Sequence, residues 1–136
     1  MPTLQSAAAL EDHRAKVLSA RDPAKPSIAV CAGAACGGLD SATVAAAFSA
    51  EIKKQAAEAK VDFRVTGCHG FCNKGPNVIA GPGDICYFEV KPEDVADIVA
   101  CTLKGEVVER LVYKHPVTGE KAVHMNEVPF YKHQMR

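Results

Sequence analysis

The sequence predicts an α/β fold in which a four-stranded mixed sheet carries flanking helices, with an N-terminal helix before it and a C-terminal extension after it. Two observations predict this fold. Four segments are short apolar runs or alternate apolar with polar residues, which is typical of strands. Two other segments repeat apolar residues at steps of three and four, which is typical of helices. In chain order these segments are strand, helix, strand, and then strand, strand, helix.

The first half of the predicted fold is a β-α-β unit. Residues 27–30 form a short apolar run, and residues 61–66 alternate apolar and polar side chains. Residues 41–59, which Asp40 or Ser41 can cap, form the helix between them. Because one crossover helix joins the two strands, we expect them to be parallel neighbours. The expected apolar face of this helix comprises Val44, Ala47, Phe48, Ile52, Ala56 and Ala59.

The second half of the predicted fold is a hairpin and a helix. Residues 78–80 and 85–88 are strand-like and flank the turn sequence Gly-Pro-Gly-Asp at 81–84. Pro92 suits the first position of a helix, and Gly105 ends it. A β-α-β unit followed by a hairpin and a helix is the thioredoxin-like layout. The expected buried face of the last helix comprises Val95, Ile98, Val99, Thr102 and Leu103.

Two flanking segments surround this central domain. Residues 3–20 are rich in Ala and Leu and predict a helix with a weak apolar stripe, which Pro23 and Pro26 separate from the domain. After the last helix, residues 107–113 favour an additional edge strand, whereas residues 127–136 show no core of their own. We therefore expect a helix and linker over 1–25, the domain over 26–105 and an extension over 106–136.

The composition argues against several functions. Sixteen Lys and Arg residues balance 16 Asp and Glu residues, so the basic excess typical of nucleic-acid-binding proteins is absent. No stretch approaches the roughly 20 apolar residues that membrane insertion requires. Glu11, Asp12 and Arg14 interrupt the Ala-rich N-terminus, which argues against a secretory signal. With no catalytic triad, phosphate-binding loop or dinucleotide-binding pattern, we expect a cytoplasmic protein without a catalytic site of its own.

Four of the six cysteines form two pairs that follow the two parallel strands. Four residues separate Cys31 from Cys36, and three separate Cys68 from Cys72. Both loops leave the same end of the sheet, because the strands that lead into them are parallel neighbours. The predicted fold therefore brings four thiols together without any assumption about a metal.

Thiolates bind zinc or iron–sulfur clusters, and the spacing favours a cluster. Structural zinc sites often use Cys-x-x-Cys, as does thiol–disulfide exchange, and this chain has no such motif. A two-iron cluster fits the longer loops, and all-cysteine ligation is usual for [2Fe–2S] centres. A zinc-stabilised interaction module and unligated structural cysteines remain alternatives. Backbone N–H donors to the sulfurs are expected from Gly33, Gly37, Gly38, Gly67, Gly70 and Gly75.

The other cysteines and the histidines are not expected to be ligands. Cys86 lies in a predicted strand and should be a small buried residue, and Cys101 lies off the apolar face of its helix. His69 stands between two of the paired cysteines, but with four cysteines present we expect it beside the site and not as a ligand. Lys74 is expected to be a solvated loop residue. Surface positions are expected for His13, His115, His124 and His133.

The cysteine loops resemble those of a known family. The segment 67–76, Gly-Cys-His-Gly-Phe-Cys-Asn-Lys-Gly-Pro, resembles the second half of the thioredoxin-like [2Fe–2S] ferredoxin signature. The first half is similar to the first cysteine pair, which follows a strand. The resemblance covers about residues 27–105 and implies single-electron transfer. It also implies a [2Fe–2S] cluster held by Cys31, Cys36, Cys68 and Cys72.

The flanks resemble a more particular arrangement. They are similar to the start of the NADH-binding flavoprotein (beta) subunit of multimeric, electron-bifurcating NAD-linked [FeFe] hydrogenases, which is related to peripheral subunits of complex I. The Pro-Phe-Tyr-Lys segment at 129–132 resembles the entry to the flavoprotein core. This resemblance implies partners among other subunits or domains of a redox complex, with FMN and NAD bound only by the parent protein. The alternative is a stand-alone ferredoxin, alone or as a homodimer.

Overall fold

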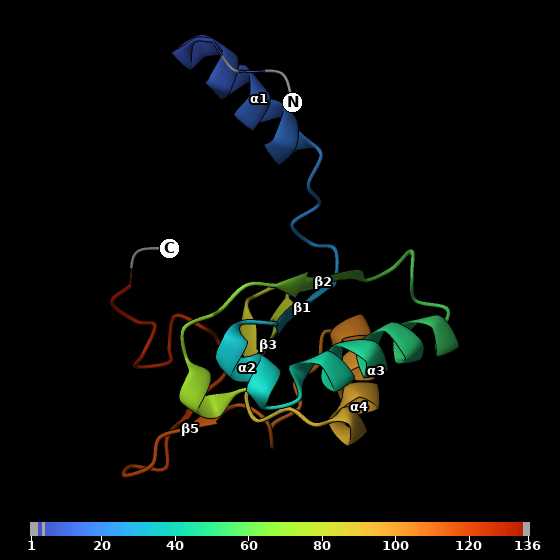
Figure 1. Ribbon diagram of the computed structural model, residues 1–136, viewed down its shortest axis with the longest axis vertical. Coiled ribbons are helices and arrows are strands. Elements are labelled where there is room, and N and C mark those ends of the chain that lie inside the picture. The colour runs from blue at the N-terminus through green and yellow to red at the C-terminus, as the bar shows by residue number, and fades with distance from the viewer. Residues whose placement is uncertain (1–2, 4, 135–136) are drawn as a thin grey trace.

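A computed structural model describes residue 3 and residues 5–134 of the chain (Figure 1). The sheet and the main helices occur where the sequence predicts them, with different ends. In chain order, the elements are α1 (Ala7–Ser19), β1 (Ser27–Cys31), α2 (Ala34–Gly38), α3 (Ser41–Lys54), β2 (Asp62–Thr66), the 3-10 helix η1 (Cys72–Lys74), β3 (Val78–Gly81), β4 (Ile85–Tyr87), the 3-10 helix η2 (Pro92–Asp94), α4 (Val95–Lys104), β5 (Tyr113–Lys114) and β6 (Lys121–Ala122).

The predicted four-stranded mixed sheet is confirmed. Its strand order is β2-β1-β3-β4, with β1 and β2 parallel and the other two pairs antiparallel. The parallel register runs from Ser27 opposite Asp62 to Cys31 opposite Thr66. Both strands therefore end at the same edge of the sheet, where the two cysteine loops begin.

The main core lies between the sheet and the helices α3 and α4. Ile28 and Val30 alternate on β1 and are completely buried against the apolar faces of both helices. In α3 the expected Val44, Phe48 and Ile52 are buried. In α4 the expected face is also buried, except that Leu103 is partly exposed.

Helix α3 is shorter than predicted. It ends at Lys54 and not at 59, because Ala56 has a positive φ of 51° and turns the chain. The N–H of Ala57 then donates to the carbonyl of Ile52 at 2.9 Å. Ala57 is completely buried as a result, whereas the expected Ala56 and Ala59 are exposed.

The C-terminal extension packs on the domain, contrary to the expectation that residues 127–136 lack a core. Val128 is completely buried and Tyr131 is 2% exposed, and both pack in a second cluster with Cys86, Phe88 and Ala122. The sequence pattern did not show this, because the apolar partners come from β4 and its end. Residues 135–136 lie outside the described part of the chain.

The predicted edge strand at 107–113 does not form. Val112 makes only an isolated bridge to Tyr87, and Tyr113–Lys114 pairs instead with Lys121–Ala122 in a separate two-stranded sheet. The physical reason is local: the extension turns back on itself at 115–120, where the N–H of His115 donates to the carbonyl of Glu120 at 2.8 Å.

Helix α1 stands apart from the rest of the fold (Figure 1). It is shorter than the predicted 3–20, because Ser6 caps its start by accepting from the N–H of Ala9 at 3.1 Å. None of its residues is buried. Residue 4 of the predicted helix lies outside the described residues. Among those described, no helix combines the length and apolar character that crossing a membrane requires.

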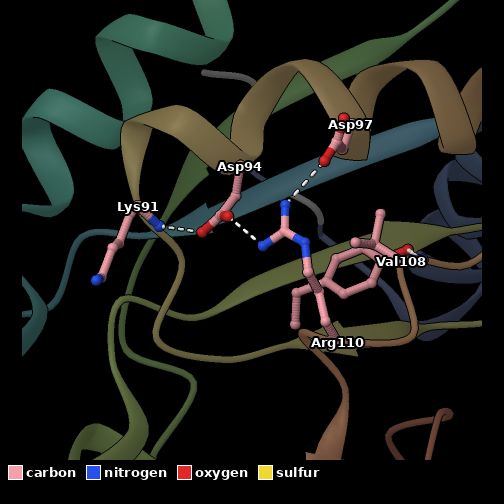
Figure 2. A network of polar contacts seen from close by, with 6 residues as sticks. Lys91, Asp94, Asp97, Val108 and Arg110 are labelled. Carbon is pink, nitrogen blue, oxygen red and sulfur yellow. Dashed lines mark hydrogen bonds and ion pairs between the residues drawn. The ribbon is translucent and has the colours of Figure 1, made fainter.

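A polar network fixes the start of the extension to α4, as Figure 2 shows. The guanidinium of Arg110 donates to the carboxylates of Asp94 and Asp97, the latter at 2.8 Å. Asp94 is only 5% exposed and also accepts from the backbone N–H of Lys91 at 2.9 Å. One buried carboxylate therefore caps the helical turn and holds the extension.

Replacing Asp94 by Ala is expected to lower the free energy of unfolding by about 1–2 kcal/mol, because the change removes a helix cap and leaves Arg110 without its buried partner. Urea unfolding followed by circular dichroism measures this loss. Asp97→Ala is the matched control, since its side chain is 61% exposed and should matter less. Equal losses in the two variants would contradict the assigned role of Asp94.

Candidate metal centre

The two cysteine loops lie side by side at one end of the sheet, as predicted from the parallel strands. The N–H of Ala32 donates to the carbonyl of Thr66 at 2.9 Å, which joins the ends of β1 and β2. The N–H of Cys31 donates to the carbonyl of Asn77 at 3.0 Å, which joins the first loop to the start of β3. Neither loop is entirely irregular: the first contains α2 and the second contains η1.

The four paired cysteines come together. The sulfurs of Cys68 and Cys72 are 3.5 Å apart. The thiol of Cys31 lies close enough to Cys36, in its own pair, and to Cys68, in the other pair, for both thiols to lower its pKa. None of the six cysteines forms a disulfide. Cys86 and Cys101 lie elsewhere, in β4 and α4, with Cys86 buried as expected and Cys101 partly exposed.

Two glycines permit this close approach. A Cβ atom on Gly33 would lie 2.8 Å from the Cβ of Cys68, and one on Gly75 would lie 2.8 Å from the sulfur of Cys36. Real Cβ atoms essentially never make contacts that short. Each of these glycines therefore lets one loop press against a cysteine of the other. Of the expected glycines, Gly37, Gly38 and Gly67 have open space instead.

The surroundings of the thiols differ between the cysteines. Burial raises the pKa of Cys36 to about 11, and its contact with Cys31 acts in the same direction. The hydrogen bond with Cys68, followed by burial, raises the pKa of Cys72. Metal-free Cys36 and Cys72 are thus protonated near neutral pH, so a metal would displace protons when it binds them.

Two of the six glycines expected as N–H donors to the sulfurs, Gly33 and Gly70, take that role, whereas the N–H groups of Gly37 and Gly75 donate to backbone carbonyls. Burial tends to raise the pKa of Cys31, but N–H donors from Gly33 and His69 outweigh it and lower that pKa. The N–H of Gly70 donates to the sulfur of Cys68 at 3.2 Å. Such donors stabilise negative charge on thiolate sulfur.

His69 lies beside the thiols, but its imidazole ring hydrogen-bonds Thr66 and not a cysteine. Its Nε2 is 2.7 Å from the hydroxyl of Thr66, which in turn donates to the carbonyl of Val30. The opposite ring nitrogen, Nδ1, is buried and has no hydrogen-bond partner among the described residues. Burial lowers the pKa of the ring. The expectation that His69 is a neighbour of the site fits these contacts.

Two residues of the site were not identified from the sequence. Asn77 is 2% exposed; its side-chain amide donates to the carbonyl of Phe71 at 3.0 Å, and its backbone also hydrogen-bonds the Cys36 thiol. Phe71 stacks on Phe130 of the C-terminal extension, with ring centroids 4.6 Å apart and planes 15° apart. The sequence features that could have indicated them are the position of Asn77, a polar residue at the start of an apolar strand, and that of Phe71, an aromatic residue in a glycine-rich loop.

The donor set fits a two-iron cluster. Thiols from two loops supply four soft ligands, and the backbone supplies donors that compensate charge on the sulfurs. The sulfurs of Cys68 and Cys72 are close together, Cys31 interacts with both pairs, and Gly33 and Gly75 leave room for the two loops to approach each other.

Comparisons with known proteins point to a [2Fe–2S] family. The family described as thioredoxin-like [2Fe–2S] ferredoxin matches residues 16–103. A [2Fe–2S] ferredoxin of Clostridium pasteurianum is 34% identical over 77 residues, which are 56% of this chain and 76% of that protein. A [2Fe–2S] ferredoxin of Aquifex aeolicus is 54% identical over 48 residues, 35% of this chain and 43% of that protein. The chain thus matches less than half of the length of the Aquifex protein at the sequence level.

The solved structures support the same assignment. The crystal structure of the wild-type thioredoxin-like [2Fe–2S] ferredoxin from Aquifex aeolicus aligns with a TM-score of 0.60 and 34% identity. The alignment covers 66% of this chain and 97% of that one. The described residues after 103, which include β5 and β6, lie outside the family match. From its fold and its sequence, the chain belongs to the thioredoxin-like [2Fe–2S] ferredoxin family, and membership of that family implies a [2Fe–2S] cluster.

Proposed function

We propose that this chain is the [2Fe–2S] electron-transfer domain of a multisubunit NAD(P)-linked oxidoreductase, of the hydrogenase or NADH dehydrogenase type. It relays single electrons between flavin or iron–sulfur centres of neighbouring subunits or domains. The observation that carries the electron-transfer role is the gathering of four thiols from two loops in a member of a [2Fe–2S] family.

In this proposal Cys31, Cys36, Cys68 and Cys72 hold the cluster. When bound, the cluster takes up and gives off one electron at a time. Around it, Gly33, Gly70 and the other backbone donors stabilise negative charge on the sulfurs. Cys31 and Cys36 are buried, whereas Cys68 is exposed and Cys72 is partly exposed, so the second pair lies nearer the surface that a partner would contact.

The surface around the thiols favours a permanent partner. Neither residues 31–39 nor residues 65–73 contain Asp, Glu, Lys or Arg. Leu39 and Val65 on this surface are 48% and 55% exposed. Transient partners are often steered together by complementary charges, whereas the centres of stable interfaces are depleted in charged residues. These charge-free stretches, which Asp40, Arg64 and the Lys74–Glu89 ion pair border, are therefore better suited to a fixed neighbour than to a diffusing one.

The test is anaerobic purification of the tagged chain from its own cells, followed by size-exclusion chromatography and addition of NADH. We expect the chain to elute in a larger complex that contains flavin, and NADH to bleach the visible absorbance of the cluster. Elution of the loaded chain alone, with no response to NADH, would contradict the multisubunit role and leave the ferredoxin assignment standing.

A second candidate is a stand-alone ferredoxin. It is favoured by the relatives from Aquifex aeolicus and Clostridium pasteurianum, which are named simply as [2Fe–2S] ferredoxins. The same experiment separates the candidates, because a stand-alone carrier elutes as a monomer or homodimer and takes electrons from a soluble donor.

A further inference from the structure

We propose that the C-terminal extension clamps the second cysteine loop, and that Phe130 is a positioning residue that holds the Gly70 N–H against the sulfur of Cys68. The inference rests on the proposed function, because that loop is assigned to the cluster. It concerns a part of the chain that lies outside the family match.

The clamp is anchored along β4 and beyond its end. The N–H groups of Cys86 and Phe88 donate to the carbonyls of Val123 and Leu111, each at 2.9 Å. Before this, the N–H of Val108 donates to the hydroxyl of Tyr87 at 3.3 Å, beside the Arg110 network of Figure 2. The extension is therefore attached to the rigid sheet at several points before it reaches the cysteine loop.

The end of the clamp is an aromatic cluster around Phe71. Phe130 stacks on Phe71, and Tyr131 meets it edge-on with centroids 6.1 Å apart and planes 85° apart. The rings of Phe88 and Tyr113 also contact Phe71, with ring centroids 5.4 and 6.1 Å from its centroid. Phe71 lies in sequence between Cys68 and Cys72, so the cluster holds the middle of the loop that carries both thiols.

Phe130 also faces the residue that donates to the sulfur. Gly70 has a positive φ of 90°, and a Cβ built on it would lie 3.4 Å from the Phe130 ring. The ring therefore lies against the backbone whose N–H donates to Cys68. Because Gly70 itself is conformationally permissive, packing from outside is needed to keep that N–H in place.

The test compares Phe130→Ala with Phe130→Tyr, which keeps the ring, and with Val117→Ala. Val117 is 87% exposed on the same extension and serves as the control. Amide hydrogen exchange is measured at Gly70 in metal-free and cluster-loaded protein, and the midpoint potential in the loaded protein. Phe130 is 41% exposed, so its truncation should not prevent folding.

In Phe130→Ala we expect Gly70 to exchange about two- to tenfold faster, with β1 and α3 unchanged, since the ring pairs of Phe130 with Phe71 and Tyr131 are lost. We also expect a lower midpoint potential, because a sulfur without its N–H donor stabilises the reduced cluster less. Phe130→Tyr and Val117→Ala should behave like the wild type. A purely structural role would raise exchange throughout the fold.

Two outcomes would overturn the clamp: unchanged Gly70 exchange in Phe130→Ala, or a raised potential, which would indicate water entry without loss of the N–H donor. Neither affects the proposed function if the wild type holds its cluster. Conversely, a wild type without a cluster would contradict the proposed function, while exchange in the metal-free protein would still test the clamp.

Discussion

Alanine in place of any one of Cys31, Cys36, Cys68 and Cys72 is expected to abolish stable cluster assembly, lowering bound iron by more than about tenfold. Each change removes one of four soft ligands, and no other cysteine lies in the two loops to replace it. Iron and sulfide assays, together with visible absorbance, measure the result on protein reconstituted under anaerobic conditions.

The matched control is Cys101→Ala. Cys101 lies in α4, outside the two cysteine loops, and is partly buried against the main core. This variant should bind as much iron and sulfide as the wild type. Wild-type iron content in any of the four loop variants would remove that cysteine from the ligand set.

The second large effect is expected at Gly75. In Gly75→Ala the new Cβ would lie 2.8 Å from the sulfur of Cys36 and 3.2 Å from Leu39. Gly75 has an ordinary extended conformation, with φ of −71°, so lack of space is the only obstacle to alanine. Overpacking of this kind typically costs about 1–3 kcal/mol, which should separate the two loops and lower cluster occupancy.

Gly37→Ala is the control for Gly75→Ala. Gly37 lies in α2 near the same thiols, and a Cβ there would meet nothing within 4 Å. Both variants are reconstituted in parallel, and bound iron is compared with far-ultraviolet circular dichroism. We expect a deficit of iron in Gly75→Ala alone, with the fold retained in both. Equal iron contents would show that close packing at Gly75 is not required for the cluster.

The meeting of the two cysteine loops was predictable from the sequence because it depends on local patterns. Two cysteine pairs each follow a strand, and the crossover rule makes the strands parallel neighbours, so the thiols had to meet. The contribution of the C-terminal extension was not predictable in this way. Val128 and Tyr131 show no periodic pattern, and their partners Cys86 and Phe88 are 40 or more residues earlier in the chain.

Helix ends were also beyond the sequence pattern. The periodicity of α3 continues through Ala56 and Ala59, yet a positive φ at Ala56 ends the helix early and buries Ala57 instead. Alanine favours a helix wherever it occurs, so its pattern does not reveal a turn imposed by packing. The same limit applies to Asn77, whose role depends on hydrogen bonds to two loops that only the fold brings together.

We expect the four thiols to hold a redox-active [2Fe–2S] cluster. The most direct measurement is electron paramagnetic resonance of the anaerobically purified, dithionite-reduced protein, with iron and sulfide assays on the same sample. We expect a spin-half signal and about two irons and two sulfides per chain. A silent sample with about one zinc per chain and no sulfide would contradict this expectation and would point to a structural metal site.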